Sequence, residues 1–304
     1  ISKTISGDIV WNGNTIPFSF MQKGVAAYTA PTAKSLEYNA EYQVLANAGS
    51  TSDGTMLYSL DESNWSTSVP QGLNASSYTL YWKIDGDATH TSLPTQSLIV
   101  TIDKGYPTVT APTAKSLTYN GSEQELVNAA STNFGTLLYS LDGTTYSTEV
   151  PSGTNAASFT VWYKVQDDSN VHGTTPQSIA CSIEKAAPTY TAPTAESLTY
   201  NGSEQALLNA GSTSHGTIQY SPDNANWSTT IPTGTNANTY TTYWRLIGDS
   251  NHTDIASTAI STVIAKASGS VTTEPTAKSL TYNADAQELV NAGSGTGAML
   301  YYEI

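Results

Sequence analysis

One ten-residue segment recurs along this chain and sets the period of the whole sequence. It runs from Pro112 to Gly121, and close copies begin at Pro31, Pro193 and Pro275. Successive copies are 81, 81 and 82 residues apart. That spacing is longer than a solenoid repeat or a propeller blade and matches one small all-β domain. The sequence therefore predicts a series of domains of this length.

The period divides the 304 residues into three complete repeats and two partial ones. The predicted immunoglobulin-like repeats are 28–105, 106–186, 187–267 and, as the first half of a fourth, 268–304. Residues 1–27 are expected to form the closing hairpin of a preceding or atypical domain, because Asn12-Gly13 is a strong tight-turn signal between two strand-like runs. A domain of this size can bury a core without metal ions or disulfides.

Alternation of apolar and polar residues predicts the strands within each repeat. In residues 106–186, period two and turn residues place strands near 116–119, 124–128, 136–141, 158–165 and 178–183. The third of these is expected to direct Leu137, Tyr139 and Leu141 to one face, as Met56, Tyr58 and Leu60 would in the first repeat. The last places Cys181 among apolar residues, so this lone cysteine is predicted to be a small buried hydrophobe.

About seven short antiparallel strands in each repeat predict an immunoglobulin-like β-sandwich. The linkers between repeats are short and contain Pro, which stiffens them. With a rise of about 3.3 Å per residue, strands of about ten residues give a domain roughly 40 Å long, and three in line about 120 Å. The expected shape is an elongated rod.

Charge and motif content exclude several classes of function. The net charge of −14 repels phosphate, so neither nucleic acid nor an anionic membrane is an expected partner. No apolar run is long enough for membrane insertion. One cysteine rules out an intramolecular disulfide framework. Four scattered histidines without a Ser-His-Asp arrangement give no support for catalysis, so we expect neither an enzyme nor a cofactor.

Five motifs carry a family resemblance. They are Ser-Leu-Thr-Tyr-Asn-Gly (116–121), Leu-Val-Asn-Ala (126–129), Leu-Tyr-Ser-Leu-Asp-Gly (138–143), Gly-Thr-Asn-Ala (153–156) and Gly-Asp-Ser-Asn-His (248–252). With them, residues 28–304 resemble the tandem bacterial immunoglobulin-like repeats of large surface proteins and phage structural proteins. The resemblance implies a stalk, adhesin or fibre outside the cell, on a bacterial or virion surface. It supplies no catalytic residue.

The best candidate ligand contact is an aromatic residue beside a cation on the penultimate strand of each repeat. The pairs are Tyr81 with Lys83, Trp162 with Lys164, and Tyr243 with Arg245. Alternation places Trp82, Tyr163 and Trp244 on the opposite, core-facing side. The outward pairs could stack against a sugar ring or a partner's aromatic residue, or could simply shield the sheet.

Polar loops suggest a metal site only weakly. Residues 249–252, with echoes at 87–90 and 168–172, contain Asp, Asn and His, but each offers too few carboxylates for calcium. Asx turns explain these residues and also Asp61, Asp142 and Asp223, so no metal is expected. Lys–Asn cross-links are not expected either, because Arg245 and Glu196 replace the aligned lysines in the third repeat.

Three functions remain open at this stage. The first is a structural or adhesive spacer that holds a distal domain away from a surface, with a protein or glycan as partner. The second is a filament subunit that associates head to tail, with residues 1–27 of one molecule completing residues 275–304 of another. The third is a carbohydrate-binding module that uses the outward aromatic residues.

Overall fold

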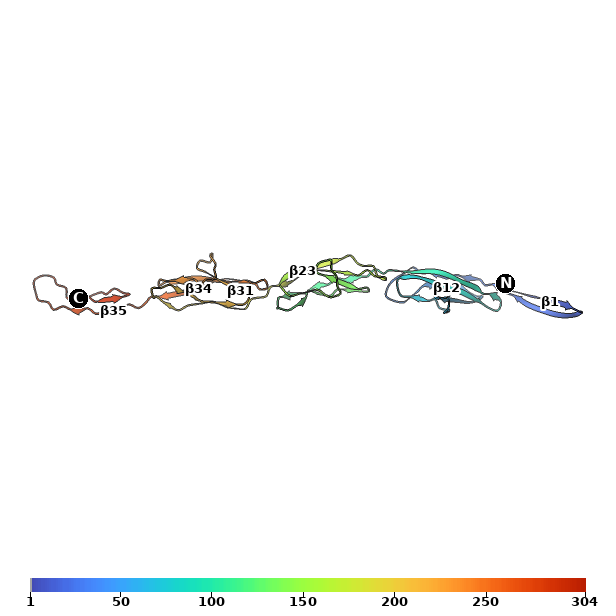
Figure 1. Cartoon of the computed structure of the whole chain (residues 1–304), viewed down its shortest axis with the longest axis horizontal. Helices are drawn as coiled ribbons and strands as arrows, with labels where there is room; N and C mark the ends of the chain where they lie inside the picture. The colour runs from blue at the N-terminus through green and yellow to red at the C-terminus, as the bar shows by residue number, and fades with distance from the viewer. Residues whose placement is uncertain (1) are drawn as a thin grey trace. The chain divides into compact units, whose positions relative to one another are not determined.

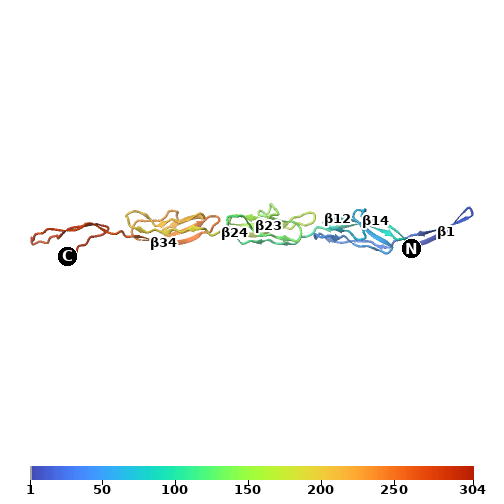
Figure 2. The same cartoon turned by 90° about the horizontal axis from the view of Figure 1, so that it is seen from below.

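The computed structural model describes residues 2–304, and these residues form β-strands, turns and extended connections without a helix. The prediction of an all-β chain is therefore confirmed. Figures 1 and 2 show long paired strands packed in sandwich-like layers, for example β12 (Ser76–Gly86) and β34 (Ile255–Ala265) with their neighbours. No helix within residues 2–304 has the length and apolarity that crossing a membrane requires.

A four-stranded sheet with one fixed strand order occurs three times. In 28–105 the order is β10 (Gly54–Ser59), β12, β14 (Leu93–Asp103) and β6 (Leu36–Glu37). In 106–186 it is β21 (Leu137–Ser140), β23 (Ala157–Val165), β24 (Gln177–Glu184) and β17 (Leu117–Thr118). In 187–267 it is β31 (Gly216–Ser221), β33 (Thr239–Gly248), β34 and β27 (Leu198–Thr199). The short strands β6, β17 and β27 run parallel to the last long strand.

Short antiparallel pairs complete each segment. One set joins β7 (Gln43–Val44) to β11 (Gln71–Gly72), β18 (Gln124–Glu125) to β22 (Ser152–Gly153), and β28 (Gln205–Ala206) to β32 (Thr233–Gly234). A second joins β5 (Thr32–Ala33) to β8 (Ala46–Asn47), β16 (Thr113–Ala114) to β19 (Val127–Asn128), β26 (Thr194–Ala195) to β29 (Leu208–Asn209), and β36 (Thr276–Ala277) to β37 (Val290–Asn291). A third joins β4 (Tyr28–Thr29) to β9 (Ser50–Thr51), β15 (Val109–Thr110) to β20 (Ser131–Thr132), β25 (Tyr190–Thr191) to β30 (Ser212–Thr213), and β35 (Ser270–Thr273) to β38 (Ser294–Thr296).

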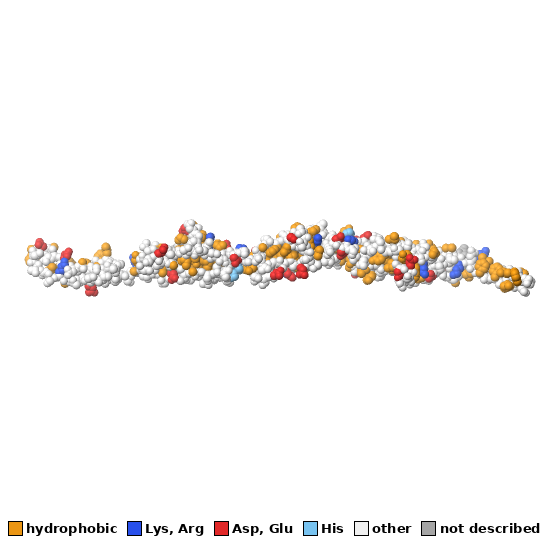
Figure 3. Space-filling view, in the orientation of Figure 1, with side chains coloured by type: hydrophobic (Ala, Val, Ile, Leu, Met, Phe, Trp, Pro, Cys, Tyr) orange, Lys and Arg blue, Asp and Glu red, His pale blue; other side chains and the backbone are white. Residues whose placement is uncertain are grey.

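Residues 1–27 contain the predicted strand–turn–strand. β1 (Lys3–Trp11) pairs with β2 (Asn14–Gln22) along its length, and Asn12 and Gly13 turn the chain with φ of 50° and 78°. β3 (Gly24–Val25) then pairs in parallel with β13 (His90–Thr91). The hairpin exposes apolar side chains, including Trp11 at 73% and Phe20 at 54%. Figure 3 shows hydrophobic side chains gathered on the surface at this end.

Alternation along the penultimate strand sets the core. In β12 the buried residues are Leu80, Trp82 and Ile84, and in β33 Trp244 and Leu246 occupy the same positions. These predicted inward positions are confirmed, although Tyr163 in β23 is only half-buried. Cys181 is 8% exposed, as predicted, and burial raises the pKa of its thiol.

The third strand is shorter than the alternation predicts. Leu60 and Leu141 were expected to lie on the same face as Tyr58 and Tyr139; those tyrosines are buried, but the leucines are 40% and 46% exposed. The strands end one residue earlier, at Ser59 and Ser140. Each serine hydroxyl donates a hydrogen bond to the turn aspartate two residues on, at 2.9 and 2.8 Å, so the turn begins before the leucine.

A buried tyrosine fixes the connection that precedes the third strand. The hydroxyl oxygens of Tyr58, Tyr139 and Tyr220 accept hydrogen bonds from the backbone N–H groups of Gly49, Ala130 and Gly211 at 2.8, 2.8 and 3.0 Å. All three rings are nearly inaccessible to solvent. Each tyrosine therefore contributes both apolar burial and a partner for a backbone donor that water does not easily reach.

The chain divides into two compact units. The first comprises the residues up to Ser116, Glu123–Gly153 and Ser158–Ser182. The second comprises Leu117–Ser122, Thr154–Ala157 and Ile183–Ile304. Residues 117–122 and 154–157 of segment 106–186 thus belong to the same unit as the segment that follows. Tyr119, Asn155 and Ala156 in these loops contact that segment directly.

Candidate functional site

The predicted aromatic–cation pairs lie half-buried on the outer face of the penultimate strands. Each cation, however, covers a ring that the sequence reasoning did not pair with it. Lys83 Nζ lies 4.7 Å from the ring centre of Trp65, Lys164 Nζ lies 4.1 Å from that of Tyr146, and Arg245 Cζ lies 4.3 Å from that of Trp227. The available signal was an aromatic residue four positions after each turn aspartate.

Irregular pairing accompanies two of these cations. The register of β12 against β14 shifts between Trp82 and Ile84, and that of β33 against β34 shifts between Trp244 and Leu246. Lys83 and Arg245 are the residues at the shifts, where a bulge can redirect a side chain. The Arg245 Nε and Nη2 groups also donate to Gln219 Oε1 at 2.9 and 2.8 Å. These contacts favour a structural role, in which each cation shields a ring of its own chain.

The turn aspartates Asp61, Asp142 and Asp223 act as hydrogen-bond acceptors for the chain that follows them. Asp142 Oδ1 accepts from the N–H groups of Thr144 and Thr145, both at 2.7 Å. These bonds, with the one from Ser140, hold the pKa of Asp142 well below its usual range. The pKa values of Asp61 and Asp223 are lowered chiefly by hydrogen bonds from Asn64 and Asn226. The charged carboxylates therefore stabilise these turns.

Replacing all three turn aspartates by asparagine should flatten the acid dependence of stability. Because the folded pKa values are depressed, the unfolded chain binds more protons as pH falls below about 4, and this part of the stability is progressively lost. The urea midpoint of the native chain should fall from pH 6 to pH 2 by more than that of the triple variant. Equal slopes would show that these turns are not the source of the acid dependence.

The polar loops at 87–90, 168–172 and 249–252 pair with the residues that lead into each segment. Val171 forms a parallel bridge with Gly105, and His252 forms one with Ala186. His90 pairs with Gly24 in the same way. In this register Val171, and not the neighbouring His172, is the counterpart of His90 and His252.

One asparagine in each of two such loops reaches the preceding segment. Asn170 Oδ1 accepts from the N–H of Ala75 at 2.8 Å, and its Nδ2 donates to Asn74 Oδ1 at 3.3 Å. Asn251 repeats both bonds with Ala156 and Asn155, at 2.9 and 3.2 Å. We call these two sets of contacts the junctions. Because both have the same geometry, the loops and linkers form one kind of connection used twice.

Ring contacts accompany both junctions. Tyr38 lies edge-on against Phe134 with ring centres 5.5 Å apart, and Tyr119 lies edge-on against His252 at 5.4 Å. At the first junction Tyr106 also stacks on His172 at 4.3 Å. An aromatic ring from one segment thus packs on the end loops of the next.

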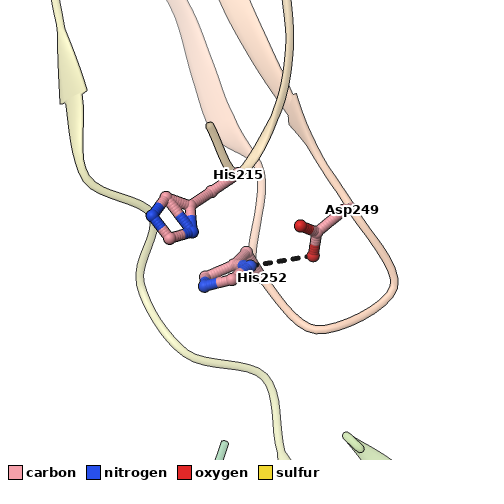
Figure 4. A group of neighbouring side chains, drawn as sticks. All are labelled: His215, Asp249 and His252. Carbon is pink, nitrogen blue, oxygen red and sulfur yellow. Dashed lines mark hydrogen bonds and ion pairs between the residues drawn. The ribbon is translucent and has the colours of Figure 1, made fainter. Parts of the chain in front are cut away.

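Beside the second junction lie three side chains that could hold a metal ion together; two of them, in loop 249–252, were weighed from the sequence, and the third, His215, was missed. Figure 4 shows His215, Asp249 and His252 pointing toward one another, with His252 Nδ1 and Asp249 Oδ1 2.8 Å apart. One ligand atom from each of the three lies within 4.8 Å of the others. The hydrogen bond from His252, followed by that from the N–H of Asn251, lowers the pKa of Asp249. His215 comes from the connection between β30 and β31, so no pattern within loop 249–252 could reveal it.

Comparison with known proteins adds no family to this picture. No model of a protein family matches the chain, and no curated protein matches it. The geometry of the junctions and of the histidine cluster therefore carries the functional argument.

Proposed function

We propose that this chain is a non-enzymatic structural or adhesive spacer of tandem immunoglobulin-like domains, arranged as a rod that holds a distal domain away from a bacterial or virion surface. The observation that carries the proposal is the repeated junction. Domains joined by flexible linkers do not need the same contacts at each linker. A spacer, in contrast, extends farther when each connection between its domains resists bending.

The junction contacts are of a kind that restrains orientation. Asn170 and Asn251 each bind a backbone N–H and a side-chain amide of the preceding segment. The backbone of Gly105 donates to Asn170 and accepts from His172, and the backbone of Ala186 bonds in the same way to Asn251 and Thr253. Several directional bonds, together with a ring contact, fix rotation as well as distance.

Small-angle scattering on the full chain tests the proposal. A compact globule of this length would have a radius of gyration of about 19 Å, whereas the spacer should give a maximum dimension of at least about 120 Å. The double variant Asn170→Ala and Asn251→Ala should broaden the distance distribution. The matched control replaces Asn47 and Asn128, whose side chains bond to Thr32 and Thr113 within their own segments, and should not. A compact native particle would refute the spacer.

A second candidate, the head-to-tail filament, is favoured by the exposed apolar side chains of the β1–β2 hairpin, such as Val10, Trp11 and Phe20. Sedimentation of the same sample separates the two proposals. A monomer at every concentration supports the spacer, and a polymer that grows with concentration supports the filament.

A further inference from the structure

Two imidazoles and one carboxylate meet at the end loops of segment 187–267. His252 is buried, His215 is half-buried and Asp249 reaches solvent. The rings of His215 and His252 lie with their centres 4.1 Å apart and inclined at 66°. Tyr119 also packs edge-on against His252, with ring centres 5.4 Å apart, which limits how that ring can turn. The cluster is therefore held by its surroundings and open at one edge.

The donor set matches a particular class of metal. Histidine nitrogen and aspartate oxygen bind Zn²⁺ at about 2.0–2.2 Å, which places tetrahedral ligand atoms about 3.3–3.6 Å apart. The ligand atoms here lie within 4.8 Å of one another, so modest side-chain rotations would close the site. Calcium and magnesium prefer sites made of oxygen atoms, which these residues do not provide.

We propose that His215, Asp249 and His252 bind one divalent transition-metal ion of the zinc class, with water as the fourth ligand. Lys185 does not compete for the carboxylate in this arrangement, because its Nζ donates to the backbone carbonyl oxygen of Asp249 at 3.0 Å. The bound ion ties the connection after β30 to the loop after β33. Since that loop also holds the junction through Asn251, the ion stiffens the junction, an effect separate from the spacer role itself.

The other segments provide internal comparisons. The positions of His215 and His252 are occupied by Phe134 and Val171 in the second segment, so that segment lacks both imidazoles. In the first segment they are occupied by Asp53 and His90, and His90 there lies between Asp53 and Asp87 at 3.8 and 3.0 Å. The proposal therefore assigns one zinc-class site to the chain.

Calorimetric titration of the untagged, metal-free full chain with Zn²⁺ tests this site. One equivalent should bind, and Co²⁺ should give the strong visible absorption of a tetrahedral complex. The variants His215→Phe and His252→Val import the residues of the second segment, so the fold should tolerate them. Each should weaken binding by at least the roughly 10–100-fold typical of losing a supporting partner. The control His90→Val should bind Zn²⁺ like the native chain.

A readout without substitution guards against misfolded variants. Zn²⁺ should shift the imidazole nitrogen resonances of His215 and His252 and leave those of His90 and His172 in place. The site is refuted if the native chain shows no saturable binding, if His215→Phe binds equally well, or if His90 or His172 responds instead.

Discussion

Leu246→Ala should destabilise segment 187–267 by about 2–5 kcal/mol, the largest effect that we expect from a single substitution. Leu246 is fully buried, lies near the end of β33 and belongs to the cluster formed with Leu207, Tyr220 and Ile264. Its truncation removes apolar burial and leaves a cavity between the layers. Hydrogen exchange of the β33 amides should accelerate accordingly, because their protection depends on opening of this segment.

The same molecule contains the control for that measurement. β12 belongs to a separate buried cluster around Leu80 and Ile84, so its amides should keep their native protection. Val263→Ala on β34 removes an apolar side chain that is 52% exposed and should change stability by no more than about 0.5 kcal/mol. Equal loss of protection in β12 and β33 would show that the segments unfold as one unit, contrary to the predicted domains.

Tyr139→Phe should cost about 1–3 kcal/mol although it removes a single oxygen atom. The hydroxyl of Tyr139 accepts the N–H of Ala130 at 2.8 Å, and both residues are buried. Phenylalanine keeps the ring packing but leaves that backbone donor without a protein partner, and water has little access to it. The urea midpoint of the native chain and the variant measures the loss.

Tyr302→Phe is the matched control for this prediction. Tyr302 Oη accepts the N–H of Gly293 at the same distance, 2.8 Å, but its ring is 49% exposed. Water can replace the lost acceptor there, so the change in stability should be within about 0.5 kcal/mol. If both variants lost equal stability, burial of the donor would not be the reason for the cost.

Sequence pattern predicted the elements well where the signal is local. Alternation in 158–165 anticipated β23, and the Asn12-Gly13 turn anticipated the hairpin of β1 and β2. Where a side-chain hydrogen bond ends the strand, as the bond from Ser140 to Asp142 does, the pattern predicted a strand that extends one residue too far. Alternation reports which face a residue occupies, and it carries no information about hydrogen bonds that end a strand.

The same distinction between local pattern and tertiary contacts applies to the candidate site. The outward position of Lys83 and Arg245 followed from strand alternation, but their ring partners Trp65 and Trp227 belong to another loop. The metal-ligating cluster shows the difference most clearly. Loop 249–252 alone offers too few ligands, and only the folded chain adds His215.

The sequence by itself determined the period, the all-β class and the inward face of the long strands, because each of these depends on residues close together in the chain. Tertiary structure decided the junctions and the His215–Asp249–His252 cluster. Asn170 and Asn74 are 96 positions apart, and sequence periodicity cannot specify which loops meet across such a distance. Packing of the sheets brings those loops to the same end, and that packing selects the partners.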